Sequence, residues 1–334
     1  MRLSLAKAAL LAAILIVIFA VFSLVWFTAM PLHSYSGALQ PLTANEAQIR
    51  DDLAGYVNQL SLAIGERNMD HIDSLNAAAD YLLHTLGQES FALSTYQYLV
   101  RGKFVKNIEV RVTGMTWPAK NVVVGAHYDS AQGSPGANDN ATGVAAVLEL
   151  ARLLKDSRPD QTIRFVFFVN EEPPYFQTDS MGSLAYAKNL RSQNVNVSAM
   201  ISLETIGYYS DAQDSQHYPA GFGLLYPNVG NFIGFVGNPA SRDLVRHALR
   251  TFRQSAHFPS EGVDAPAWLT GIGWSDQWSF WQQGYHGIMV TDTALFRYPY
   301  YHSSGDTPDK VQFDKMARVV EGLQRVILGL AAGN

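Results

Sequence analysis

Two adjacent glutamates, Glu171 and Glu172, directly follow a strongly apolar stretch of the chain at residues 165–169. Such a run of β-branched and aromatic residues is typical of a strand buried on both faces of a parallel sheet. Two carboxylates a few ångströms apart repel each other by roughly 3 kcal/mol at an effective dielectric of about 20, so they require compensating positive charge. No Lys or Arg lies between Arg164 and Lys188, which makes a metal ion the obvious source of that charge. The alternative is that the two glutamates simply begin a solvated loop.

Other side chains that could bind a metal recur where further strands are predicted to end. In open α/β sheets, ligands gather at the carboxyl ends of the strands. Each residue alone has an ordinary explanation, since a lone histidine is more often packed or solvated and Asp139 is a good N-cap for a following helix. The repeated placement at successive strand ends favours a binding site over these separate explanations. The residues are, in chain order, His127, Asp139, Glu171, Glu172, Glu204 and His302.

Two imidazoles and three carboxylates of this set are sufficient to bind two metal ions. They suit borderline cations such as zinc if one carboxylate bridges both ions. Two divalent ions, three carboxylates and a bridging hydroxide carry no net charge, so the cluster can lie in a partly buried cleft. Glu171 is left over and, as a general base, can take a proton from the attacking water. The five ligand candidates are His127, Asp139, Glu172, Glu204 and His302.

The elements that must position these residues alternate between strand and helix. A strand at residues 121–126, a helix at 141–155 and a strand at 162–169 form a βαβ unit, whose crossover is expected to be right-handed. The remaining predicted elements are helices at 46–64, 74–86 and 311–330, a half-buried strand at 104–112, and strands at 199–203 and 287–291. We therefore predict an α/β fold, a three-layer α/β/α sandwich with a mixed, mainly parallel central sheet.

Composition excludes several classes of function. A chain of 334 residues that is 48% hydrophobic can bury a large core. The net charge of −5 and the absence of any basic run argue against a surface that binds nucleic acid. The chain contains no cysteine, which excludes thiol catalysis, disulfides and cysteine-ligated zinc.

The N-terminal segment is apolar and long enough to cross a membrane. Residues 8–30 carry no formal charge, and a helix of this length spans roughly 34 Å, against about 30 Å of hydrocarbon. Arg2 and Lys7 precede the span, which predicts a cytoplasmic N-terminus and a periplasmic or extracellular remainder. The apolar run exceeds the roughly 7–15 residues of a signal peptide, so we predict an uncleaved anchor, with secretion after cleavage as the alternative.

The predicted organisation has three parts. Residues 1–30 comprise a cytoplasmic tip and the transmembrane anchor, residues 31–45 form a stalk, and residues 46–334 form the catalytic domain. The predicted partners are accordingly the lipid bilayer, through the N-terminal helix, and the substrate of the catalytic domain.

Seven short motifs surround the candidate ligands. They are GAHYDS (125–130), GANDNATG (136–143), VNEE (169–172), MGS (181–183), SLET (202–205), WSDQWSF (274–280) and YYHSSGDTPDK (300–310). Together these motifs, over residues 106–330, resemble the two-zinc aminopeptidases, such as the bacterial secreted leucyl-type enzymes, and more distantly glutamate carboxypeptidase and glutaminyl cyclase. The resemblance implies two zinc ions, with cobalt or manganese as substitutes, and a peptide substrate.

The resemblance also implies a role for individual residues. It implies that the five candidate ligands bind the two ions and that Asp139 bridges them, with a cis peptide bond between Asp139 and Asn140. Glu171 is then the general base, and Tyr301 steadies the developing oxyanion. Two further carboxylates orient the imidazoles that bind metal. They are Asp129, for His127, and Asp306, for His302.

Three features depart from the pattern of that family. Residues 173–176 (PPYF) stand where a glycine-bearing turn is common, which puts the adjacent pocket wall in doubt. Gln277 stands where SDH motifs carry histidine, which puts a polar contact of that loop in doubt but removes no ligand. The loop at 207–229 matches nothing in the family, and it either covers the cleft or is an ordinary surface excursion.

We therefore predict a membrane-anchored metallo-exopeptidase, an aminopeptidase that hydrolyses the N-terminal peptide bond of peptides. One alternative is carboxypeptidase or dipeptidase specificity. Another is a single-zinc acyl transfer of the glutaminyl cyclase kind, against which the retained His127 argues. The non-enzymatic alternative is an inactive binding protein on a peptidase fold, which would be expected to have lost ligands, and none is lost here.

Overall fold

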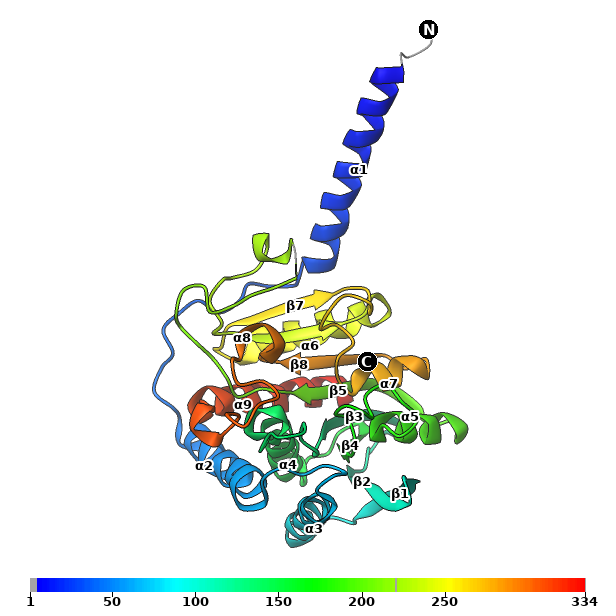
Figure 1. The fold of residues 1–334 in the computed structure, drawn as a ribbon, viewed down its shortest axis with the longest axis vertical. Helices are drawn as coiled ribbons and strands as arrows, with labels where there is room; N and C mark the ends of the chain where they lie inside the picture. Colours follow the sequence, from blue (N-terminus) through cyan, green and yellow to red (C-terminus); the bar gives the residue numbers. More distant parts are fainter. Residues whose placement is uncertain (1–4, 220, 334) are drawn as a thin grey trace.

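An eight-stranded mixed sheet runs through the centre of the structure, a computed structural model in which residues 5–219 and 221–333 are described (Figure 1). The strand order is β1-β2-β4-β3-β5-β8-β6-β7. The strands are β1 (Ser94–Val100), β2 (Lys103–Val112), β3 (Trp117–His127), β4 (Gln161–Phe168), β5 (Asn196–Glu204), β6 (Ile233–Gly237), β7 (Ser260–Asp264) and β8 (Gly287–Thr291). The central strands β4, β3, β5 and β8 are parallel, whereas β2 and β6 run antiparallel to their central neighbours. The predicted sheet is confirmed.

Helices cover both faces of this sheet, so the predicted three-layer sandwich is confirmed as well. α2, α3, α4, α6 and α9 pack on one face, and α5 and α7 pack on the other (Figure 1). Each face has its own apolar core, with Val147 and Phe252 on the first and Tyr186 and Phe280 on the second. The helices are α1 (Leu5–Thr28), α2 (Ala44–Asn58), α3 (Ile72–Gln88), α4 (Gly143–Leu154), α5 (Gly182–Ser192), α6 (Arg242–Ser255), α7 (Gln277–Gln282), α8 (Ala294–Arg297) and α9 (Phe313–Ala331).

Each element predicted from the sequence has a counterpart in the structure. The long first helix of the domain consists of α2, which begins at a capping box formed by Thr43 and Glu46, and a π-helical extension, η1 (Gln59–Ile64). The strands β1, β6 and β7 and the helices α5 to α8 were not predicted. β6 and β7 are five residues long and contain glycine, so they carry little local pattern.

The prediction of a half-buried strand at residues 104–112 is wrong in one respect. The polar side chains of Asn107 and Glu109 in β2 are buried, because α5 covers the face that was expected to be solvated. Asn107 donates a hydrogen bond to the carbonyl of Gly182 at 2.8 Å, and Glu109 pairs with Arg164 of the neighbouring strand at 3.3 Å. These two side chains therefore make their polar contacts inside the protein rather than with water.

The N-terminal helix α1 extends away from the domain (Figure 1). Its window Ala6–Ser23 has a mean hydropathy of 2.5 and buries none of its residues within the protein, as expected for a helix that crosses a membrane. Arg2, one of the two charges used to predict orientation, lies outside the described residues. The orientation of the span and the division of the chain at residues 30 and 45 stay predictions.

The end of the predicted anchor and the start of the predicted stalk lie against the sandwich domain at the edge strand β7. Met30 packs against Gly262 of that strand. Arg253 of α6 donates to the carbonyl of Leu32 at 2.8 Å, and the backbone N–H of Ser260 donates to the Ser34 hydroxyl at 2.9 Å. These contacts define which side of the domain faces the end of α1.

Candidate metal centre

All six residues predicted to bind metal or act as base converge at one place. The Nε2 atom of His127 lies 3.2 Å from Glu204 Oε2 and 3.5 Å from Asp139 Oδ1. The Nε2 atom of His302 lies 3.1 Å from Asp139 Oδ2 and 3.2 Å from Glu172 Oε2. Among the described residues, three groups of three side chains could hold a metal ion: His127, Asp139 and Glu204; Asp139, Glu172 and His302; and His127, Glu171 and Glu172. The first two groups share Asp139. One carboxylate oxygen of Asp139 faces each histidine, as a bridging ligand requires.

The spacing of these atoms is close to that of zinc ligands and slightly tighter. Ligand atoms about 2.0–2.2 Å from a tetrahedral zinc ion lie about 3.3–3.6 Å from one another. The four nitrogen-to-oxygen distances within the two groups range from 3.1 to 3.5 Å. Two buried atoms of the cluster have no hydrogen-bond partner among the described residues. They are Oδ2 of Asp139 and Nε2 of His127. Both atoms are therefore available to an ion.

The parallel order of the central strands explains why residues far apart in the sequence meet here. His127 ends β3 and Glu204 ends β5, its parallel neighbour, while the two glutamates follow β4 on the other side of β3. Asp139 lies in the turn η2 (Ala137–Thr142) ahead of α4, and its own backbone angles are not helical. The peptide bond between Asp139 and Asn140 is cis, so that prediction is confirmed.

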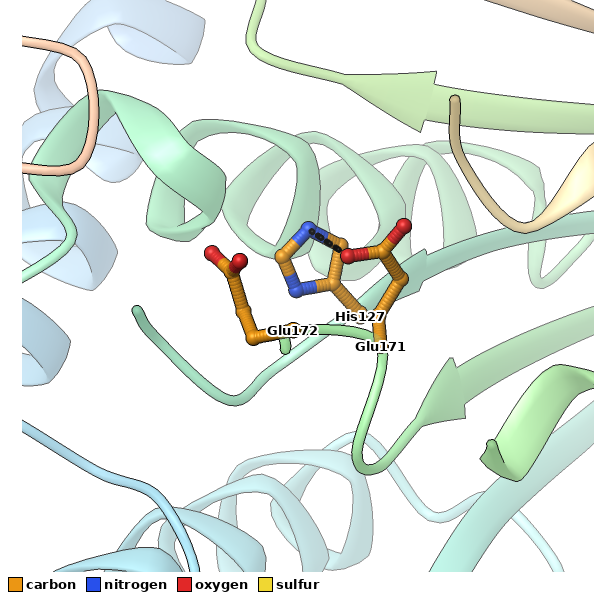
Figure 2. Close-up of side chains that lie close together, drawn as sticks. All are labelled: His127, Glu171 and Glu172. Carbon is orange, nitrogen blue, oxygen red and sulfur yellow. Dashed lines mark ion pairs between the residues drawn. The ribbon is translucent and has the colours of Figure 1, made fainter. Parts of the chain in front are cut away.

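The two adjacent glutamates project in different directions, as Figure 2 shows. The carboxylate of Glu171 points toward the imidazole of His127, with Oε2 at 3.9 Å from Nε2, while Glu172 lies on the other side of that ring. Asp129 maintains this arrangement, because its carboxylate accepts hydrogen bonds from the backbone N–H groups of both glutamates at 3.1 Å. It also lies 3.5 Å from Nδ1 of His127, the position expected of a group that orients this ring.

Asp306 occupies a different place from the predicted one. Its carboxylate accepts hydrogen bonds from the backbone N–H groups of Asn138, at 2.7 Å, and Asp139, at 3.0 Å, and from the Tyr298 hydroxyl at 2.6 Å. Among the described residues we find no hydrogen bond between Asp306 and His302. In the structure, Asp306 therefore positions the turn that carries Asp139 rather than the imidazole of His302.

Burial and like charge shift the pKa values of the ligands in the metal-free cluster. Burial raises the pKa of Glu172 to about 7, and it raises the pKa of Glu171 well above its usual value. Although burial lowers the pKa of His302, the adjacent carboxylates of Asp139 and Glu172 raise it to about 10. Cations that bind here replace these protons, so metal affinity rises with pH.

Tyr301 lies beside the cluster. Its ring stacks on that of His302 with 3.9 Å between centroids, and it lines a cavity together with Glu204. Burial and the surrounding carboxylates raise the pKa of the Tyr301 hydroxyl, so this group keeps its proton and can donate a hydrogen bond. Its predicted role at the oxyanion stays a prediction.

An apolar cavity of about 110 Å³ adjoins the cluster at Glu204 and Tyr301. Its other walls come from the region of β6 to β8 and from the loop at 207–229, which contributes Tyr218, Phe222 and Tyr226. The structure therefore favours the interpretation that this loop covers the cleft. Residues 173–176 are not among the residues that line this cavity.

The loop of the WSDQWSF motif lies beside the cluster as well. The hydroxyl of Ser275 donates to Glu204 Oε2 at 2.7 Å, and Asp276 is fully buried. Gln277, the departure noted above, donates to the carbonyl of Ile272 within its own loop at 3.0 Å. Gln277 therefore stabilises the loop from inside, and Ser275 is the residue of this motif that contacts a ligand.

Arg67 supports the loop next to the cluster, a role that the sequence pattern did not reveal. This fully buried guanidinium donates hydrogen bonds to the backbone carbonyls of Tyr128, Pro135 and Gly136 at 2.7, 2.6 and 2.8 Å. It thereby fixes the loop between His127 and the turn of Asp139. Burial lowers the pKa of Arg67 to about 10, although nearby aspartates raise it. No motif marks this position, so the only signal was a lone arginine in a loop.

We expect Arg67→Met to destabilise the protein by at least roughly 2 kcal/mol, because three buried carbonyls lose a charged donor. The replacement also loosens the loop that leads to Asp139, so zinc affinity falls. Chemical denaturation and zinc titration measure the two effects, and Arg158→Met, at an exposed position, is the matched control. Equal stability and zinc affinity in both variants would contradict this role for Arg67.

Comparisons with known proteins identify the family of this chain. The profile of peptidase family M28 matches residues 107–327. The uncharacterized protein YfbL of Escherichia coli is 36% identical over 282 residues, which cover 82% of this chain and 86% of YfbL. The probable aminopeptidase YDR415C of Saccharomyces cerevisiae is 28% identical over 244 residues, covering 68% of this chain but only 57% of the yeast protein. The structure of BSAP, a zinc aminopeptidase from Bacillus subtilis, aligns with a TM-score of 0.67 and 14% identity over 83% of this chain and 94% of BSAP.

Proposed function

Because this chain belongs to peptidase family M28, we propose that it is a two-zinc aminopeptidase that removes the N-terminal residue of peptides. The observation that carries the proposal is the pair of three-ligand groups that share Asp139. Membership of a family of zinc peptidases supports zinc as the metal and hydrolysis of a peptide bond as the reaction. The carboxylate shared by the two groups supports two ions rather than one. The relatives named as aminopeptidases support cleavage at the N-terminal bond.

His127, Asp139 and Glu204 would hold one ion, and Asp139, Glu172 and His302 the other. When bound, zinc supplies Lewis-acid activation of the scissile carbonyl and of the attacking water. Glu171 is grouped with His127 and Glu172 but not with the shared Asp139, and its carboxylate lies 3.9 Å from Nε2 of His127. As general base, Glu171 accepts the proton of the water and then returns it to the amine that leaves.

Tyr301 donates a hydrogen bond to the substrate carbonyl oxygen as negative charge develops there. Its place beside His302, on the wall of the apolar cavity, supports this role. The free α-amine of a peptide is a cation, and the buried carboxylates of Glu171 and Glu204 offer it a partner next to the cavity. A blocked N-terminus loses this attraction.

We further propose that α1 anchors the protein in a membrane, with the N-terminus cytoplasmic and the domain on the periplasmic or extracellular side. The apolar stretch of α1 supports a membrane span, and Lys7, ahead of the uncharged residues 8–30, supports the orientation. Removal of the segment as a signal sequence, followed by secretion, is the alternative.

The test of the function is hydrolysis of a peptide panel by protein of known metal content. We expect two zinc ions per chain, and release of the first residue from free peptides but not from the same peptides with an acetylated N-terminus. Release of the last residue instead would show carboxypeptidase specificity, and ring closure of N-terminal glutamine with one ion per chain would show a cyclase. No turnover of any peptide by the two-zinc protein would favour a binding function.

A further inference from the structure

The helix α6 has a row of arginines that faces the end of the membrane anchor. The guanidinium of Arg242 lies over the ring of Trp26 at 4.3 Å, and Arg246 donates a hydrogen bond to the carbonyl of Ala29. Arg242, Arg246 and Arg250 follow one another at four-residue intervals, so they share one face of the helix. This face therefore lies where α1 would leave a membrane.

The charge of α6 contrasts with that of the whole chain. The helix contains four arginines and one aspartate, in a protein whose net charge is −5. Two of the arginines pair with carboxylates of β7, Arg242 with Asp264 at 2.7 Å and Arg253 with Glu261 at 3.4 Å. Arg250 is exposed, and among the described residues no ion pair to it is found. Basic side chains next to a membrane anchor complement the phosphates of lipid headgroups.

Apolar side chains are exposed on the same side of the domain. The short helix η3 (Phe222–Leu224) lies at the same end of the domain as the end of α1 (Figure 1), and Leu224 is 87% exposed. Tyr226 connects this loop to the anchor, because its hydroxyl donates to the carbonyl of Gly262 at 2.7 Å and Gly262 lies against Met30. Leu224 and Leu225 therefore lie next to the position at which the chain leaves the span.

A second loop contributes to the same apolar surface. Trp268, four residues after β7, is 81% exposed. The neighbouring residues Leu269 and Gly271 line the same cavity as Phe222 and Tyr226, so the two loops face each other across it. We call Leu224, Leu225 and Trp268 the apolar rim. Exposed leucine and tryptophan side chains beside basic residues are the composition of surfaces that lie at a membrane interface.

We propose that the catalytic domain rests on the lipid bilayer, with the apolar rim at the boundary between headgroups and acyl chains and with Arg246 and Arg250 of α6 beside lipid phosphates. The bilayer is the partner because α1 already leads from it to this face of the domain. The inference rests on the membrane anchoring proposed above and is independent of the catalytic proposal.

The absence of cysteine from the chain permits a direct test with single labels. The variants Leu224→Cys and Trp268→Cys, in the full chain, are labelled with a small fluorophore and reconstituted into vesicles of phosphatidylcholine and phosphatidylglycerol that contain a lipid-borne quencher. Phe104→Cys, 69% exposed on β2 near the opposite edge of the sheet, is the matched negative control. Ile16→Cys, 68% exposed on α1, reports insertion of the anchor.

We expect the labels at residues 224 and 268 to be quenched several-fold more strongly than the label at 104. Arg250→Glu should reduce quenching at 224 in vesicles with phosphatidylglycerol but not in phosphatidylcholine alone. The circular dichroism spectrum and thermal unfolding of each variant confirm that the fold is retained.

Quenching at residue 16 without quenching at 224 and 268 would overturn the docking proposal while leaving the anchor intact. Absence of quenching at all four positions would overturn the anchor, and docking with it. Shielding of the labels at 224 and 268 from water without quenching by lipid would show that a protein surface covers the rim, which also overturns the proposal.

Discussion

Glu171→Gln is expected to retain two zinc ions while lowering kcat by roughly 10²- to 10⁴-fold, the usual contribution of a general base. Glutamine preserves the size and polarity of the side chain but cannot accept the proton of the attacking water. The carboxylate of Glu171 is paired with His127 at 3.9 Å, the longest of the five separations, and belongs to neither group that shares Asp139. Its loss should therefore leave the ligands of both ions in place.

Glu172→Gln is the matched control, since it makes the same chemical change one residue further along the chain. Glu172 lies 3.2 Å from Nε2 of His302 within a group of three ligands, so its replacement should weaken binding of one ion. Metal content by elemental analysis and kcat on a free peptide separate the two variants. Equal loss of metal in both would show that the division of roles between the glutamates is wrong.

Removal of metal by a chelator is expected to abolish hydrolysis, and zinc or cobalt should restore it. Without cations, three buried carboxylates and two imidazoles converge within hydrogen-bonding distance of one another. The metal-free protein should also unfold at lower temperature, because an ion that binds only the folded state stabilises it. Full activity in protein shown by elemental analysis to lack metal would contradict the proposed function.

Zinc affinity is expected to fall as the pH falls. The ligands must release protons to bind cations, and in the metal-free cluster the pKa of Glu172 is raised to about 7 and that of His302 to about 10. Protons therefore compete more strongly as pH falls, and we expect zinc to be released more readily below the pKa of about 7 of Glu172 than above it. Zinc titrations of the metal-free protein at several pH values measure this trend. A zinc affinity that does not change with pH would contradict it.

Much of the fold and of the site could be predicted from the sequence because the signals are local. The apolar run at residues 165–169 and the periodic spacing of α4 and α9 identify a buried sheet covered by helices, since these patterns depend on neighbours along the chain. The ligands were found because each stands directly after such an element or within a specific motif. The apolar N-terminal segment was equally clear from its length and composition alone.

The tertiary structure decided what depends on contacts between distant segments. The order β4-β3-β5-β8 determines that His127 shares a group with Glu204 while Glu172 shares one with His302, and no local pattern specifies strand order. Burial of Glu109 depends on a helix that follows it by many residues, and the role of Arg67 depends on carbonyls of another loop. The sequence by itself therefore determined which side chains could bind metal. Long-range packing decided how they pair, what holds them and which side of the domain faces the anchor.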